Sequence, residues 1–98
     1  MDEHGERVCR AAATYASAAD HYLRSALDFW DRYGTATVER LGLRPGKAVA
    51  DLCCGTGASA IPAARAVGPT GRVVAVDAAG PMVERTRARA AQQALANL

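Results

Sequence analysis

The fold can be predicted from one stretch of the chain, Val49-Ala50-Asp51-Leu52-Cys53-Cys54-Gly55-Thr56-Gly57. The run from Ala48 to Leu52 is short and mostly apolar, as in a strand that is buried on both faces of a parallel sheet. The glycine-rich part that follows breaks the strand and predicts a tight turn. A second run, Arg72 to Asp77, is richer in β-branched residues and predicts another strand.

Each predicted strand is followed by a predicted helix. Ser59 can cap the first helix, whose inward side would carry Ile61, Ala64 and Val67. Gly80-Pro81 starts the second helix, which is expected to run nearly to Leu98. Its buried side is marked by Met82, Val83, Thr86, Ala90 and Ala94. Because a helix crosses between the two strands, they must be parallel, and the predicted fold class is α/β: a β-α-β-α unit of a doubly wound parallel sheet.

A helical region precedes the first strand, and two or three helices are predicted in the first 43 residues. Apolar residues recur at three- and four-residue intervals from Tyr22 to Tyr33, which is typical of one helix face. Gly34 is predicted to stop this helix, and Gly42 to end a short further one. At this spacing we expect the aromatic residues, Trp30 among them, to pack on the core; the alternative is that they line a ligand pocket.

Composition excludes several classes of protein. The chain has 98 residues, so it forms one small globular domain at most. A net charge of +2 does not favour nucleic acid as a partner. The sequence has no run of about 20 apolar residues, so no membrane span is predicted. The acidic N-terminus is unlike a secretory signal, and we therefore expect a cytoplasmic protein. Cys9 is isolated and Cys53 and Cys54 are adjacent, which predicts free thiols and no metal site.

Two acids lie at or near the carboxyl ends of the predicted strands, where open α/β sheets bind ligands. They are Asp51 and Asp77, and the glycine-rich turn lies between them. Gly55 and Gly57 would let the backbone approach a ligand, beside free N–H groups at the start of the next helix. Asp77 is placed to accept hydrogen bonds from both hydroxyl groups of a ribose. The pattern therefore predicts a cofactor that contains a nucleoside.

Two classes of cofactor fit this pattern. The stretch from Gly55 to Ala60 also satisfies the G-x-G-x-x-G/A pattern of NAD(P)-binding proteins. Asp51 disfavours a pyrophosphate there, since two like charges about 5 Å apart repel by about 3 kcal/mol at an effective dielectric constant of about 20. S-adenosyl-L-methionine has no phosphate, and its methionyl part carries an ammonium and a sulfonium. Asp51 therefore favours S-adenosyl-L-methionine.

The stretch from Val49 to Gly57 resembles motif I of the class I S-adenosylmethionine-dependent methyltransferases, and Gly71 to Asp77 looks like the strand with their ribose-binding acid. The resemblance covers about residues 40 to 95. It implies a Rossmann-like fold with the methionyl part at Asp51, Gly55 and Gly57, the ribose at Asp77, and the adenine near Ala78 and Met82. Cys53 stands where the family most often has a first glycine, so its Cβ would narrow the turn beside the cofactor.

Cys53 and Cys54 are expected to be small buried hydrophobic residues rather than redox or nucleophilic groups. The last predicted helix carries Arg85, Arg87 and Arg89, of which Arg85 and Arg89 share one exposed helix face. We expect that face to be solvated rather than to bind nucleic acid.

The family's sheet has seven strands, so the resemblance implies that this chain is its N-terminal portion, ending before the third strand. We divide it into a helical cap, 1–43, and the first half of the cofactor-binding domain, 44–98. The cap is similar to that of the ubiquinone and menaquinone biosynthesis methyltransferases. The expected activity is methyl transfer to a small-molecule acceptor, with catalytic residues beyond Leu98, so the chain alone is not expected to be active. Its open sheet edge would allow self-association. The alternatives are an NAD(P)-binding fragment of an oxidoreductase and a non-catalytic, cofactor-binding remnant.

Overall fold

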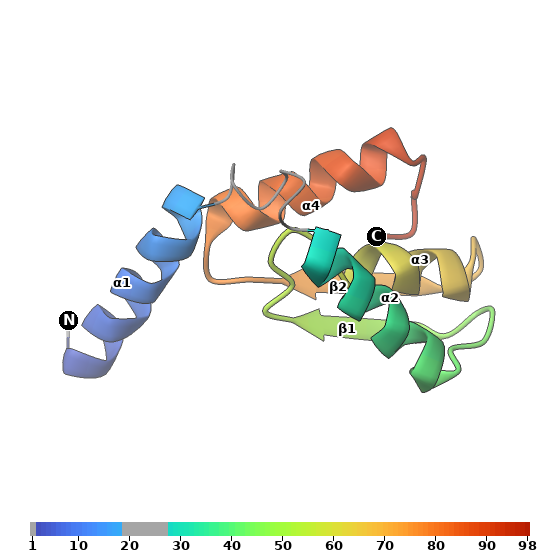
Figure 1. The fold of residues 1–98 in the computed structure, drawn as a ribbon, viewed down its shortest axis with the longest axis horizontal. Helices are drawn as coiled ribbons and strands as arrows, with labels where there is room; N and C mark the ends of the chain where they lie inside the picture. The colour runs from blue at the N-terminus through green and yellow to red at the C-terminus, as the bar shows by residue number, and fades with distance from the viewer. Residues whose placement is uncertain (1, 19–27) are drawn as a thin grey trace.

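The computed structural model describes residues 2–18 and 28–98 (Figure 1). In chain order the elements are helices α1 (Glu3–Ala18) and α2 (Asp28–Leu41), strand β1 (Ala48–Leu52), helix α3 (Ala60–Val67), strand β2 (Arg72–Val76) and helix α4 (Gly80–Gln92). The two strands pair in parallel, with Ala48 opposite Arg72 and Leu52 opposite Val76. The predicted α/β fold, the order of its elements and the parallel pairing are confirmed. The division at residue 43 stays a prediction.

Helix α3 packs on one face of the sheet. Its buried residues Ile61, Ala64 and Val67 are the predicted inward side, and Val73 of β2 is buried in one cluster with Ala64 and Val67. The other face is open in the described part of the chain, where the side chains of Leu52 and Val74 are 73% and 51% exposed. Burial alternates along both strands because only one face is covered. The prediction that β1 is buried on both faces is therefore wrong for these residues.

Helix α2 runs through Gly34, so the prediction that this glycine stops a helix is wrong. Gly34 is buried, and a Cβ built on it would lie 2.0 Å from the carbonyl oxygen of Ala58, in the turn after β1. The missing side chain therefore serves close packing of α2 on that turn. Helix α2 ends at Leu41, and Gly42 follows with a φ of 61°, as predicted.

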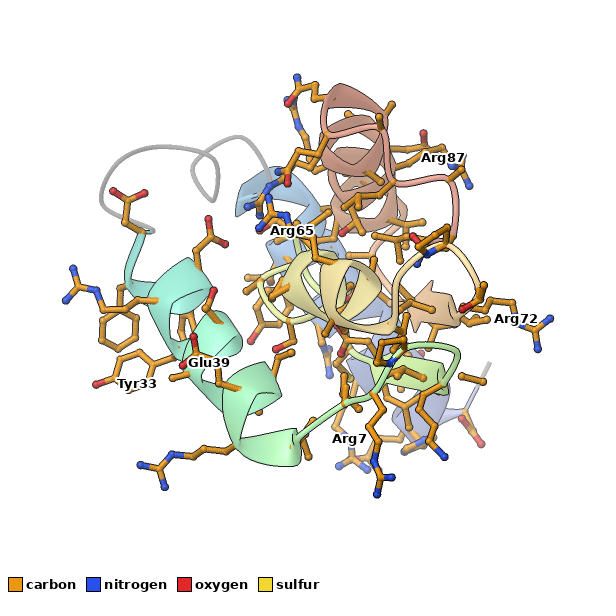
Figure 2. All side chains as sticks on the ribbon, turned by 90° about the vertical axis from the view of Figure 1, so that its right-hand side faces the viewer. Arg7, Tyr33, Glu39, Arg65, Arg72 and Arg87 are labelled. Carbon is orange, nitrogen blue, oxygen red and sulfur yellow. The ribbon has the colours of Figure 1, made fainter. Side chains whose placement is uncertain are left out.

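The aromatic residues of α2 do not pack in the core. Trp30 and Tyr33 are 49% and 59% exposed, and both line a cavity rather than the core, as the alternative expectation had it; Figure 2 shows the ring of Tyr33 projecting from α2. The core expectation is wrong for these two residues, because α2 turns Gly34 and Val38 inward instead. Tyr22 lies outside the described residues.

Helix α4 begins at Gly80 with Pro81 in its first turn, as predicted, and buries Met82, Thr86 and Ala90. It ends at Gln92 rather than near Leu98. Ala94 has a φ of 54°, and the N–H of Leu95 donates to the carbonyl of Ala90 at 2.9 Å, which closes the helix end. Ala94 is exposed, contrary to the prediction. Among the described helices, none combines the length and apolar character needed to span a membrane.

Candidate functional site

A cavity of about 570 Å³ lies at the carboxyl ends of the two strands. Both strand arrows in Figure 1 point to this edge, and α1 lies beyond it. The cavity is lined by parts of α1, α2 and the loops after β1 and β2. Six of the seven residues predicted to bind cofactor line it: Asp51, Cys53, Gly55, Asp77, Ala78 and Met82. The seventh, Gly57, does not.

Asp77 is held in place by two backbone amides. Its Oδ2 accepts a hydrogen bond from the N–H of Gly55 at 2.8 Å, and its Oδ1 accepts one from the N–H of Ala79 at 2.9 Å. One carboxylate thus joins the turn after β1 to the start of α4. Each carboxylate oxygen can accept more than one hydrogen bond, so Asp77 can also receive hydroxyl groups of a ligand without giving up either amide.

Asp51 has a buried carboxylate oxygen, Oδ2, without a hydrogen-bond partner among the described residues. Burial raises the pKa of Asp51 above its ordinary value of 3.8; a hydrogen bond from the backbone of Ala60 lowers the pKa, and the charge of Asp77 raises it. A buried oxygen of this kind is costly unless a donor or a cation meets it. A ligand that brings an ammonium group to this end of the cavity would satisfy Asp51.

The turn between the two acids has left-handed backbone conformations at Cys53, Gly55 and Gly57, with φ of 60°, 55° and 92°. A Cβ on Gly55 would project into open space, so its backbone faces the cavity. A Cβ on Gly57 would instead lie 3.1 Å from Cγ1 of Ile61 and 3.2 Å from the side chain of Thr86. Gly55 therefore offers close approach to a ligand, whereas Gly57 allows close packing on α3 and α4.

The two adjacent cysteines differ. Cys54 is buried as predicted, and burial raises the pKa of its thiol above the ordinary 9.0, although a hydrogen bond with Thr86 lowers it. The thiol therefore stays protonated at neutral pH. Cys53 is exposed and lines the cavity, so the prediction that it is buried is wrong. Its place in the left-handed turn carries the side chain out of the core.

Two residues behind the turn were not predicted as part of the site. The Thr86 hydroxyl donates to the carbonyl of Gly55 at 2.9 Å, and Nη1 of Arg89 donates to the carbonyl of Thr56 at 2.9 Å. The side chain of Arg89 is only 18% exposed and forms an ion pair with Asp31, so the prediction of a solvated face is wrong for Arg89. Its guanidinium folds back onto the turn. The sequence held one signal for these contacts: Thr86, one helix turn before Arg89, is a polar residue on the predicted buried side of the helix.

Aromatic side chains from two helices lie at the same cavity. Tyr15 of α1 and Trp30 of α2 line it while staying about half exposed, at 52% and 49%. The ring of Phe29 meets Trp30 edge-on at 5.2 Å and Tyr33 at 4.7 Å between centroids. The cavity therefore presents apolar ring surface as well as the two acids.

Comparison with known proteins agrees with this geometry. Residues 49–98 match the methyltransferase domain family. The chain belongs to the class I S-adenosylmethionine-dependent methyltransferases. The resemblance inferred from motif I and the strand before Asp77 is thereby confirmed.

Three relatives show how much of a methyltransferase the chain represents. Nocamycin O-methyltransferase of Saccharothrix syringae is 39% identical over 74 residues, which are 76% of this chain and 26% of the relative. Demethylmenaquinone methyltransferase of Lactococcus lactis is 34% identical over 68 residues, 69% of this chain and 27% of that protein. A crystal structure of a SAM dependent methyltransferase from Aquifex aeolicus superposes with a TM-score of 0.58 at 26% identity, covering 65% of this chain and 34% of that one. The chain thus spans about a quarter of the length of these two curated relatives.

Proposed function

We propose that this chain binds S-adenosyl-L-methionine and is the cofactor-binding part of an enzyme that methylates an apolar small molecule. The observation that supports this most strongly is the buried Oδ2 of Asp51, which has no partner in the described residues. The ammonium group of the cofactor would supply both the missing donors and the opposite charge. A pyrophosphate at the same place would add like charge beside a buried acid.

The proposal gives each part of the cavity one part of the cofactor. The methionyl end lies against Asp51 and the backbone of Gly55, and the ribose hydroxyls donate to Asp77. Ala78 and the buried Met82 give apolar surface for the adenine. When bound, the cofactor supplies an electrophilic methyl group; the residues of this chain bind and orient it, which is where the catalytic advantage of proximity arises.

The proposed acceptor is a small ring compound with apolar character. Tyr15 and Trp30 line the cavity and keep half of their surface exposed, and aromatic rings favour offset or edge-to-face contact with other rings. Several relatives are named for ring-containing acceptors, among them demethylmenaquinone and 2-phytyl-1,4-naphtoquinone. The net charge of +2 does not favour a nucleic-acid acceptor.

Calorimetry with S-adenosylhomocysteine and with NAD⁺ tests the choice of cofactor. We expect S-adenosylhomocysteine to bind and NAD⁺ not to bind. Asp51→Asn should lower the affinity for S-adenosylhomocysteine at least tenfold, because a hydrogen bond to a charged group contributes about 1.5–3 kcal/mol. Asp28→Asn is the matched control, since Asp28 is an exposed acid of α2 that does not line the cavity. Tighter binding of NAD⁺ would establish the dinucleotide alternative.

A separate titration tests the acceptor. 2-Naphthol is a ring compound that does not react with thiols, and we expect it to bind the protein saturated with S-adenosylhomocysteine. Trp30→Ala should abolish that binding while leaving the affinity for S-adenosylhomocysteine within about threefold. Equal 2-naphthol binding by both proteins would show that Trp30 is not part of the acceptor surface.

A further inference from the structure

Arg89, near the end of α4, joins three segments that are far apart in the sequence. Its Nη1 and Nη2 donate to the two carboxylate oxygens of Asp31 on α2, at 3.1 and 2.9 Å. The same Nη1 donates to the carbonyl of Thr56 at 2.9 Å. A two-point contact of this kind fixes the plane of the guanidinium, and the Arg89 side chain is 18% exposed, whereas that of Asp31 is 44% exposed.

Helix α2 meets the same turn at a second point. Gly34 lies one helix turn after Asp31, and its Cα packs directly on the carbonyl of Ala58. The turn is thus held to α2 at Thr56, through Arg89, and at Ala58, by direct contact. The same helix places Trp30 at the cavity.

The turn needs such restraint because of its composition. Thr56 stands between Gly55 and Gly57, both with positive φ, and glycines leave a free chain many other conformations. If the turn were not held, ordering it would oppose ligand binding and lower the apparent affinity. Arg89 does not itself line the cavity, but it donates a hydrogen bond to Thr56, which does, so its effect on a ligand would pass through the turn.

We propose that Arg89 is a positioning residue that holds the Thr56 carbonyl and, through Asp31, ties α2 to the cofactor turn, so that cofactor binding and the placement of α2 are coupled. The coupling is reciprocal: a ligand that orders the turn also orders α2, and a change that loosens α2 lowers the affinity for the ligand. This inference rests on the proposed function in taking S-adenosylhomocysteine as the ligand.

The first test compares Arg89→Met with Arg87→Met in calorimetry with S-adenosylhomocysteine, well below the unfolding temperature. Arg87 pairs with Glu84 at 2.8 Å with 71% of its side chain exposed, and Figure 2 shows it pointing away from the protein. We expect Kd to rise at least tenfold for Arg89→Met and to change less than twofold for Arg87→Met. Arg89→Lys and Asp31→Asn should each raise Kd at least threefold, because neither keeps the two-point contact.

The second test is amide hydrogen exchange of α2 with and without S-adenosylhomocysteine. In the wild-type protein the ligand should slow exchange in α2 at least threefold, and in Arg89→Met this protection should be lost. An Arg89→Met protein that melts at a lower temperature but keeps the wild-type Kd and the protection of α2 would overturn the proposal, since the residue would then be only structural.

Two further outcomes remain decisive. If Arg89→Met does not fold, Arg89→Lys and Asp31→Asn are judged by the same two measurements. If the wild-type protein does not bind S-adenosylhomocysteine, the proposed function fails separately. The inference is then decided by exchange in residues 54–58 of the ligand-free proteins, which should be at least threefold faster in Arg89→Met than in Arg87→Met. Equal rates would overturn it.

Discussion

Replacing Gly34 by Ala probes the contact between α2 and the cofactor turn with one added methyl group. Gly34 is inside a helix, where Ala is normally more stable than Gly by about 0.5–1 kcal/mol. Here the new Cβ would lie 2.0 Å from the oxygen and 2.3 Å from the carbon of the Ala58 carbonyl. Both atoms belong to the backbone, so no side-chain rotation can relieve the contact.

The size of the effect follows from the displacement required. Real Cβ contacts are essentially never shorter than 3.0 Å, so α2 or the turn must retreat by at least 1.0 Å. Overpacking of this kind costs about 1–3 kcal/mol. The same retreat would stretch the 2.9 Å contacts of Arg89 past hydrogen-bonding range. Subtracting the gain in helix propensity leaves about 1 kcal/mol from overpacking, and the lost Arg89 contacts add about 1 kcal/mol, so we expect Gly34→Ala to lower the free energy of unfolding by about 2 kcal/mol.

Urea unfolding, followed by the fluorescence of the single tryptophan, Trp30, measures this change. The matched control is Gly80→Ala at the start of α4, where a Cβ has nothing within 4 Å. That variant should be within about 0.5 kcal/mol of the wild type. If Gly34→Ala were as stable as Gly80→Ala, with an unchanged slope in urea, α2 would not lie against Ala58 and the reasoning about the turn would be refuted.

Three other substitutions test the cavity itself. Asp51→Asn should be more stable than the wild type at neutral pH. Because the pKa of Asp51 is raised in the folded protein, the folded state binds the carboxyl proton more tightly than the unfolded state does. The free energy of unfolding of the wild type therefore falls as the pH rises from 3.8 through the raised pKa. The advantage of Asn in urea unfolding should grow over that window, and one that shrank with rising pH would contradict the burial of Asp51. Cys53→Gly should be neutral or stabilising by about 1 kcal/mol in the same assay. A φ of 60° costs a residue with a Cβ about 1–2 kcal/mol, and the greater chain entropy of glycine in the unfolded state offsets part of the gain from removing that strain. A clear loss of stability would show that the Cys53 side chain makes contacts that stabilise the fold. Asp77→Ala should reduce the binding free energy of S-adenosylhomocysteine, measured by calorimetry, by about 1.5–3 kcal/mol. An unchanged affinity would show that Asp77 does not bind the ribose.

The elements around motif I could be predicted because their signals are local. The β-branched run before Asp77, the glycines of the turn and the Gly80-Pro81 helix start each act within a few residues. Parallel pairing then followed from the intervening helix. The end of α4 was missed because it depends on Ala94 adopting a positive φ, which alanine rarely does.

The candidate site was harder to predict because burial and partners depend on tertiary packing. The carboxylates could be placed from strand ends, but nothing local shows that Oδ2 of Asp51 is buried without a partner. A buried helical glycine and a helix-stopping glycine look the same in a sequence, so Gly34 was misread. The spacing of Arg89 from Arg85 suits an exposed face equally well, and only the approach of Asp31 and Thr56 distinguishes it.

Helix α2 contacts the turn and lines the cavity with residues on two adjacent stripes of its surface. At 3.6 residues per turn, Asp31, Gly34 and Val38 fall on one stripe, which meets Arg89, Ala58 and the core. Trp30, Tyr33 and Thr37 fall on the neighbouring stripe, which lines the cavity together with Gly34 at the border of the two stripes. A rigid helix cannot move one stripe without the other. Any shift of the cofactor turn that displaces α2 therefore also displaces the aromatic surface proposed for the acceptor, so the cofactor and acceptor parts of the cavity are mechanically linked.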